Sequence, residues 1–384
     1  MQQKGRPQKI ILSELRKIRE QDHKYREGRI LCSMCSKPHA VAKAAHQLFL
    51  EANLGDPGLF PGTVKLEREA IRYLTELLNG KNAVGFIVTG GTEANLLALL
   101  AARNKAKTNN PEVVLPQSAH FSFNKICSML CIKPVYAKLG NTFQVEPLNV
   151  EECINENTIA IVGTAGTAEL GAIDPIDKLS EIALEHEIYL HVDAALGGLI
   201  LPFMENAPPF DFRVRGVNSI TVDPHKIGMS IIPAGGILFR DDTYLEHIKT
   251  ETPYLTEGTQ YTFVGTRSGA SAAATWAVFE TLGREGYANI VKRCLSLTNL
   301  LASQLKKRGL TLVMEPALNI VAFRAKDAKY LAAILRQRGW FVSYVPRFNC
   351  IRIIVMPHTK KKHIMAFLKE LDNINATCNC SLYL

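Results

Sequence analysis

The sequence predicts an α/β protein with a mainly parallel sheet in a large domain and a smaller α+β domain at the C-terminal end. Between residues 83 and 240, short β-branched runs alternate with helical stretches, which is typical of strands connected by covering helices. From residue 283 onward, long amphipathic helices and two short apolar runs replace this alternation. The chain has 384 residues, of which 47% are apolar, so it can bury a large core.

The elements are expected in a simple order along the chain. Residues 1–50 should form a helical N-terminal segment, residues 51–282 the large domain and residues 283–384 the small domain. The expected strands of the large domain are AVGFIVTGG (83–91), PEVVLP (111–116), TIAIVGTAG (158–166), EIYLHVDAA (187–195), SITVD (219–223) and GGILFR (235–240). The small domain should contain helices over 285–309 and 328–339, strands over 319–325 and 350–357, and a final helix.

Composition narrows the possible functions. The net charge of +9 comes from scattered basic residues with no aromatic-interleaved basic stripe, so no nucleic-acid partner is expected. No apolar run approaches the roughly 18 residues of a membrane helix, and the N-terminus has no signal-peptide core. We therefore expect a soluble cytoplasmic protein.

The nine cysteines suggest reduced thiols rather than disulfides. Cys32 and Cys35 have C-x-x-C spacing, and Cys378 and Cys380 lie near the C-terminus. A zinc site usually needs a second matched pair and supporting turn residues, which are missing. No metal site is expected.

Four short segments place chemically capable residues where predicted strands end. They are TGGTEAN (89–95), QSAHFSF (117–123), HVDAALGG (191–198) and DPHKIG (223–228). Each has an ordinary explanation when taken alone: a tight turn, a structural histidine, a helix N-cap and a solvated lysine. In open α/β sheets, however, ligands bind beyond the carboxyl ends of the strands.

Together, the four segments supply what pyridoxal 5'-phosphate (PLP) requires. Lys226 can bond covalently to the cofactor aldehyde, and Asp193 can keep the pyridine nitrogen protonated. The glycine turn before a helix can hold the phosphate. The 33 residues from Asp193 to Lys226 leave room for one helix and one strand between them.

These motifs also resemble a known family. GGTEAN, AHFSF, HVDAALGG and DPHKIG resemble the group II PLP-dependent amino-acid decarboxylases, and more closely the archaeal L-tyrosine/L-aspartate decarboxylase family. Further similar segments are NLGDPGLFPGT, GTAGTAELGAID, PYLTEGTQ, VGTRSGA, LGREGY, EPALNIVA and RIIVMPH, so the resemblance covers residues 10 to 370. It implies the PLP-dependent transferase fold type I and a carbon–carbon lyase. The implied reactions are L-aspartate to β-alanine, for coenzyme A biosynthesis, and/or L-tyrosine to tyramine, for methanofuran biosynthesis.

The resemblance assigns cofactor roles to several residues. It implies that His120 stacks on the cofactor ring and that Gly91 and Thr92 bind the phosphate, with His225 as a further contact. Thr167 is expected at the cofactor as well, with Thr164 nearby. One position departs from the family, which more often has threonine where Ala168 stands, so one cofactor hydrogen bond is in doubt.

Substrate roles follow from the same resemblance. Arg352 matches the arginine that relatives use against the substrate α-carboxylate, a task that suits the guanidinium fork. The proton donor to the former α-carbon is expected to be Tyr254, with Tyr261 as second choice, on a mobile polar loop. Phe60 is expected to line the substrate pocket. The segment GTRSG is expected to reach the cofactor of a partner subunit in a homodimer.

Other interpretations are compatible with most of the same residues. Cysteine desulfuration or the conversion of phosphoseryl-tRNA to cysteinyl-tRNA would use PLP on the same fold, and Cys32 and Cys35 keep the latter open. A cofactor-free scaffold protein is a third possibility. The retained lysine, aspartate, histidine and glycine turn argue against it.

Overall fold

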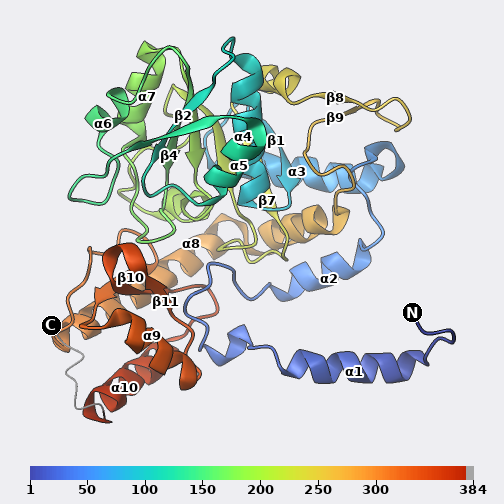
Figure 1. Cartoon of the computed structure of the whole chain (residues 1–384). Coiled ribbons are helices and arrows are strands. Elements are labelled where there is room, and N and C mark those ends of the chain that lie inside the picture. Colours follow the sequence, from blue (N-terminus) through green and yellow to red (C-terminus); the bar gives the residue numbers. More distant parts are fainter. Residues whose placement is uncertain (378–384) are drawn as a thin grey trace.

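A seven-stranded sheet forms the centre of the large domain in the computed structural model, which describes residues 1–377 (Figure 1). Its strand order is β1-β7-β6-β5-β4-β2-β3, and only β7 runs against its neighbours. The prediction of a mainly parallel sheet is therefore confirmed. The strands are β1 (Val84–Val88), β2 (Glu112–Pro116), β3 (Lys133–Ala137), β4 (Thr158–Thr164), β5 (Tyr189–Asp193), β6 (Val217–Val222) and β7 (Gly235–Phe239). Cys378 and Cys380 lie outside the described residues.

The edge strand β3 was not predicted from the sequence. It reads KPVYA, and Lys133 and Tyr136 are exposed while Pro134 interrupts the apolar pattern. Proline and exposed polar residues are tolerated at a sheet edge because one side of the strand needs no ladder partner. Parallel pairing with β2 decides its conformation.

Helices cover both faces of the sheet because neighbouring strand residues point to opposite sides. Val113, Leu115 and Val162 belong to a core that contains residues of α4, whereas Val114 and Ile161 belong to the opposite core, toward α3 and α7. The helices of this domain are α3 (Pro61–Leu77), α4 (Gly91–Lys105), α5 (Ser122–Leu130), α6 (Pro147–Glu151) and α7 (Ile176–Glu185). Short 3-10 turns are η2 (Pro57–Leu59), η3 (Gly197–Leu199), η4 (Leu201–Phe203) and η5 (Asp242–His247).

The long helix α8 (Gly269–Lys307) connects the large and the small domain (Figure 1). Its backbone leaves helical geometry at Gly283 (φ 54°), the residue at which the sequence pattern changes. Val278 packs in the large core, whereas Leu301 packs in a separate core. That second core is built on β10 (Ile320–Arg324), α9 (Ala328–Gln337), β11 (Ser343–Val345), η6 (Pro346–Phe348), β12 (Cys350–Ile354) and α10 (Lys361–Thr377), with sheet order β10-β12-β11.

The N-terminal segment contains α1 (Gln8–Glu20), η1 (Tyr25–Glu27) and α2 (Ala40–Leu48). It packs against both domains, because Leu31 lies in the core of the small domain and α2 packs along α8. By contrast, α1 has no buried residue and projects from the body (Figure 1). A second projection is the hairpin arm, residues 250–265, with strands β8 (Thr250–Glu251) and β9 (Thr259–Gln260). None of the helices within residues 1–377 is both long and apolar enough to cross a bilayer.

Candidate active site

A cavity of about 330 Å³ opens at the carboxyl edge of the large sheet. Residues that follow β1, β2, β4, β5 and β6 meet there, because parallel strands end at the same edge. The lining residues are Met34, Thr89, Gly90, Gly91, Thr92, Glu93, Asn95, His120, Thr164, Gly166, Ala168, Asp193, Ala195, Leu196, Asp223, His225, Lys226 and Ile232. The structure thus brings the four sequence segments into one site.

The glycine turn after β1 leads directly into α4. Gly90 has φ +138°, a conformation that L side chains rarely adopt, and it is the N-cap of α4 with no side-chain cap. A Cβ on Gly91 would lie 3.0 Å from Asp223 Oδ2, which is tighter than most Cβ contacts, so a side chain here would press against Asp223. The uncapped N-terminus of α4, with Gly91 and Thr92 on the cavity wall, can bind a phosphate.

Asp193 is held in a polar chain that the sequence did not reveal. Its Oδ2 accepts from Asn95 Nδ2 (3.1 Å), and its Oδ1 accepts from the backbone N–H of Ala195 (3.1 Å). Asn95 Oδ1 in turn lies 3.0 Å from His191 Nε2, and Ser219 Oγ lies 2.8 Å from His191 Nδ1.

The hydrogen bonds of this polar chain determine which of its side-chain atoms carry protons. Because Asn95 donates to Asp193 through Nδ2, its Oδ1 must be the acceptor, and His191 donates to it through Nε2–H. His191 Nδ1 then accepts from the Ser219 hydroxyl. Burial lowers the pKa of His191 to about 4, which keeps the ring neutral. Asp193 therefore accepts on both oxygens, as an ionised carboxylate does.

No cationic side chain among residues 1–377 pairs with Asp193, although it is only 6% exposed. A buried carboxylate without a cation is costly unless a ligand supplies the positive group. A protonated pyridine nitrogen is such a group. Asn95 lies in the quoted segment TGGTEAN, but its role became visible only when β5 was placed beside α4.

Lys226 follows β6 in the turn that begins with Asp223 and Pro224. Its Nζ lies 3.1 Å from Asp223 Oδ2, and its backbone N–H donates to the Asp223 carbonyl. His225 donates from Nδ1 to the carbonyl of Ala234 (2.5 Å), while its Nε2 lies 3.8 Å from Asp223 Oδ2. Asp223 was not among the predicted site residues, although it begins the motif DPHKIG.

His120 lies on the cavity wall after β2. Its Nδ1 accepts from the backbone N–H of Ser122 (3.3 Å), so Nε2 carries the proton of the neutral ring. Burial lowers the pKa of His120 and favours this neutral form. A flat neutral ring in the cavity is compatible with the predicted stacking role.

Of the two threonines predicted near the cofactor, Thr164 lies on the cavity wall and Thr167 does not. The Thr164 hydroxyl is buried and has no hydrogen-bond partner among the described residues. Thr167 Oγ1 instead accepts from the backbone N–H of Ala172 (3.0 Å), so it stabilises the loop of residues 167–172. Ala168 lines the cavity, so its methyl group forms part of the wall.

Arg352 does not line the cavity, but it contacts one of its walls. Its guanidinium donates to the carbonyl of Ala168, to the carbonyl of Cys32 (3.2 Å) and to Ser343 Oγ (2.9 Å). Arg352 Nε is buried and has no partner among residues 1–377. Arg352 thus joins the small domain to the cavity wall.

The predicted proton donors lie on the hairpin arm, away from this cavity. Tyr254 is 87% exposed, and Tyr261 stacks on Phe86 with ring centroids 5.7 Å apart. Neither lines the cavity within one chain. Glu93, which lines the cavity, nevertheless forms a hydrogen bond with the arm.

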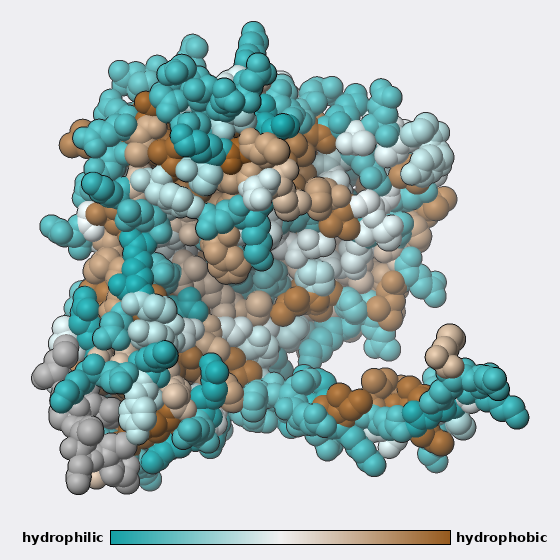
Figure 2. Space-filling view, viewed as in Figure 1, coloured by the Kyte–Doolittle hydropathy of each residue, from teal (hydrophilic) through white to brown (hydrophobic). Residues whose placement is uncertain are grey.

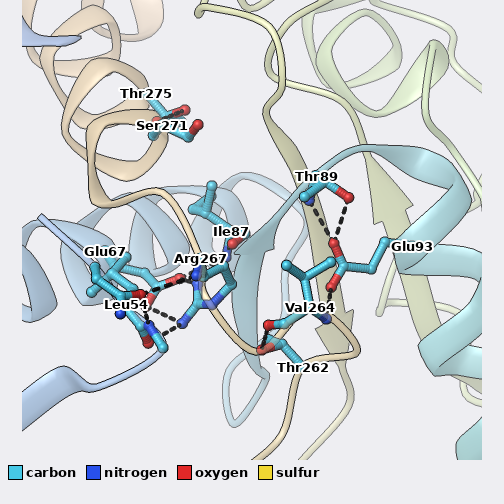
Figure 3. Close-up of polar contacts among 12 residues, drawn as sticks. Leu54, Glu67, Ile87, Thr89, Glu93, Thr262, Val264, Arg267, Ser271 and Thr275 are labelled. Atoms are coloured by element: carbon cyan, nitrogen blue, oxygen red, sulfur yellow. Dashed lines mark hydrogen bonds and ion pairs between the residues drawn. The ribbon is translucent and has the colours of Figure 1, made fainter. Parts of the chain in front are cut away.

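Figure 3 shows this connection. Glu93 Oε2 accepts from the backbone N–H (2.8 Å) and hydroxyl (2.6 Å) of Thr89, and Glu93 Oε1 accepts from the N–H of Val264 (3.1 Å). Nearby, Arg267 forms a buried ion pair with Glu67. The Arg267 side chain of GTRSG therefore points into its own subunit. That the segment reaches the cofactor of a partner subunit stays a prediction.

Phe60 precedes α3 and, within one chain, lines a separate surface hollow together with residues 47–52. Its role as a wall of the substrate pocket stays a prediction.

Cys35 lies near the cavity, between Met34, which lines it, and Ser36, whose N–H donates to the His225 carbonyl (3.4 Å). Burial raises the pKa of Cys35 and of Cys32. Sulfur transfer needs the opposite change, a lowered thiol pKa. Residues 1–377 contain no group of three or more His, Cys, Asp or Glu side chains arranged to hold a metal ion.

The residues of the cavity fit PLP. Among residues 1–377, no cation pairs with Asp193, no side chain caps the N-terminus of α4, and no group bonds to the Thr164 hydroxyl, while Lys226 is within reach. These are groups that a pyridinium, an aldehyde and a phosphate would satisfy.

Comparisons with known proteins agree with this chemistry. Residues 58–326 match the pyridoxal-dependent decarboxylase conserved domain. A probable L-aspartate decarboxylase of Archaeoglobus fulgidus is 47% identical over 364 residues, which cover 95% of this chain and 99% of the relative. A probable L-tyrosine/L-aspartate decarboxylase of Methanothermobacter thermautotrophicus is 50% identical over 356 residues, 91% of this chain and 98% of the relative.

Solved structures share the fold. A sphingosine-1-phosphate lyase of Burkholderia pseudomallei has a TM-score of 0.90 at 30% identity, with 97% of this chain and 91% of that chain covered. A glutamate decarboxylase of Lactobacillus brevis has a TM-score of 0.88 at 22% identity, with 97% and 93% covered. The similarity spans both domains.

Proposed function

This chain belongs to the pyridoxal-dependent decarboxylase family, and we propose that it removes the α-carboxyl group of L-aspartate, of L-tyrosine or of both. It is a PLP-dependent carboxy-lyase. The observation that carries the proposal is the meeting of Lys226, Asp193 and the N-terminus of α4 in one cavity, in a chain whose relatives bear these substrate names. The products are CO2 with β-alanine or tyramine. Roles in coenzyme A and methanofuran biosynthesis are part of this proposal.

When bound, PLP supplies an electron sink for the electron pair that remains when CO2 leaves. Asp193 would face the ring nitrogen as an ionised acceptor, with Asn95 fixing its orientation. Lys226 would hold the cofactor, while Gly91 and Thr92 would bind its phosphate with backbone N–H groups. Neutral His120 would pack against the ring and exclude water from one side.

The substrate carboxylate and the final proton need two further groups. We assign the α-carboxylate to Arg352, whose guanidinium contacts the wall at Ala168 and whose Nε has no partner among residues 1–377. Tyr254 would donate a proton from Oη to the former α-carbon, one proton for each CO2 released. Because Tyr254 is 87% exposed within one chain, this role requires that the hairpin arm move or that a second subunit approach.

A homodimer is part of the proposal. On α1, four apolar residues are between 42% and 59% exposed. They are Ile10, Leu12, Leu15 and Ile18. Figure 2 shows apolar surface along the helix that projects from the body. An amphipathic helix without a partner face is unfavourable in water, so burial against a second copy would stabilise it. Light scattering of the wild type and of a Leu15→Glu/Ile18→Glu variant tests this: the variant should dissociate, and an unchanged mass would contradict the role of α1.

The substrate is tested by competition. The protein with PLP receives equimolar aspartate, tyrosine, glutamate and cysteine sulfinate, and the amine products are measured by mass spectrometry. Aspartate is common to the names of both relatives, so β-alanine is expected among the products. Absence of both β-alanine and tyramine would refute the substrate proposal.

The lysine is tested separately. Lys226→Ala should abolish CO2 release and the visible absorbance of the bound cofactor, because no other amine lies among the lining residues. The matched control is Lys178→Ala, which removes an exposed lysine on α7. A Lys226→Ala variant that releases CO2 at the native rate would contradict the mechanism.

A further inference from the structure

Asp223 places a negative charge where the cofactor phosphate is expected. The residue is 3% exposed, and its Oδ2 lies 3.0 Å from the position of a Cβ on Gly91, at the start of α4. The same oxygen lies 3.1 Å from Lys226 Nζ and 3.8 Å from His225 Nε2. Asp223 therefore lies among the groups that also suit an anionic ligand.

The other carboxylate oxygen has no partner. Asp223 Oδ1 is buried and makes no hydrogen bond with any residue between 1 and 377. An unpaired buried carboxylate oxygen is unfavourable, so its position needs a compensating role. Its backbone is firmly placed, since the Asp223 N–H donates to the Ala195 carbonyl (3.2 Å) and its carbonyl accepts from Lys226 N–H.

Two anions in one site repel each other unless a cation lies between them. Three positive or partly positive groups are available here: the Lys226 ammonium, the helix N-terminus and the His225 ring. In the chain without cofactor, Asp223 is the anion that satisfies Lys226. A cofactor held by Lys226 would bring a phosphate that competes with Asp223 for the remaining positive groups.

We propose that Asp223 is a positioning residue that holds Lys226 beside the N-terminus of α4 and occupies the anion site until the cofactor phosphate takes its place. Displacing Asp223 then requires free energy, and this requirement lowers the affinity for the cofactor. Removing the charge of Asp223 should increase the share of the cofactor binding free energy that the phosphate supplies. A residue that only packs against its neighbours would not have this effect. The proposal rests on the cofactor assignment of this site and is independent of the amino-acid substrate.

The experiment compares PLP with pyridoxal, which carries the same aldehyde and ring but no phosphate. Cofactor-free full-length protein is titrated with each aldehyde, and binding is followed by the visible absorbance that the aldehyde acquires when bonded to a lysine. The measured quantity is the ratio of the two dissociation constants, pyridoxal over PLP. In Asp223→Asn this ratio should rise by about tenfold relative to the wild type, because the like charge beside the phosphate is gone.

Asp211→Asn is the matched control. Asp211 is also buried, 1% exposed, and ion-paired with Arg213, but it lies outside the cavity, so its ratio should equal that of the wild type. Where Asp223→Asn is not recovered folded, Asp223→Ser carries the same test with a smaller uncharged side chain. An unchanged ratio would overturn the proposal, since Asp223 would then have no influence on the phosphate. A lower ratio would also overturn it, because the carboxylate would then support phosphate binding. Neither result depends on which amino acid is decarboxylated.

Discussion

Replacing Asn95 by aspartate tests the polar chain that holds Asp193. The two side chains have nearly the same shape, so the substitution puts a carboxylate oxygen where Asn95 Nδ2 now donates to Asp193 Oδ2 at 3.1 Å. Asn95 is 1% exposed and Asp193 is 6% exposed, so solvent screens the pair poorly. A donor is thereby exchanged for a like charge.

The size of the effect follows from the distance. At 3.1 Å and an effective dielectric constant of about 20, two unit charges repel by about 5 kcal/mol. Uptake of one proton by the carboxylate pair or by His191 relieves part of this repulsion. We therefore expect the dissociation constant for PLP to rise at least about 100-fold, since a half-protonated pair is a poorer partner for the ring nitrogen.

The assay is a PLP titration of the cofactor-free protein, followed by visible absorbance, together with the decarboxylation rate at saturating PLP. The control is Asn104→Asp, which makes the same chemical change on the exposed part of α4. That variant should bind PLP like the wild type. If Asn95→Asp binds PLP within about threefold of the wild type and keeps its rate, Asp193 is not the partner of the ring nitrogen.

Three further predictions concern stability and catalysis. Glu67→Gln breaks the buried ion pair shown in Figure 3 and should lower the free energy of unfolding, measured in urea, by about 3 kcal/mol. Glu76→Gln removes a charge from an exposed pair and should change the free energy of unfolding by less than about 0.5 kcal/mol. Equal changes in the two variants would contradict a stabilising role of the buried pair. Because burial lowers the pKa of His191 to about 4, its stabilising contribution is complete above about pH 6.5 and is lost as the pH falls toward 4, by up to about 3 kcal/mol. His191→Asn should therefore show a smaller loss of unfolding free energy between pH 7 and pH 5 than the wild type, and an identical loss would exclude a neutral buried ring. Tyr254→Phe should lower the decarboxylation rate at least about tenfold without changing PLP absorbance, while Tyr330→Phe, on exposed α9, should not; a native rate would move the proton donor elsewhere.

The sequence by itself determined the architecture of the large domain. Alternation of buried strands and covering helices is a local pattern, so six of the seven strands of the sheet could be located from residue types alone. The exception, β3, has little apolar pattern of its own, and its neighbour β2 decides its conformation. The meeting of Lys226 and Asp193 in one cavity was also predictable, because Lys226 follows β6, Asp193 ends β5, and parallel strands end at one edge of a sheet.

Only the tertiary structure decided which other residues join them. Asn95 faces Asp193 because α4 packs over β5, although the two residues are 98 positions apart. Asp223 meets the start of α4 from the end of a different strand, and Thr167 bonds within its own loop while Thr164 reaches the cavity. These outcomes depend on distances between segments that are remote in sequence. Residue type and spacing carry no information about them, because side-chain contacts are set by packing of the whole domain.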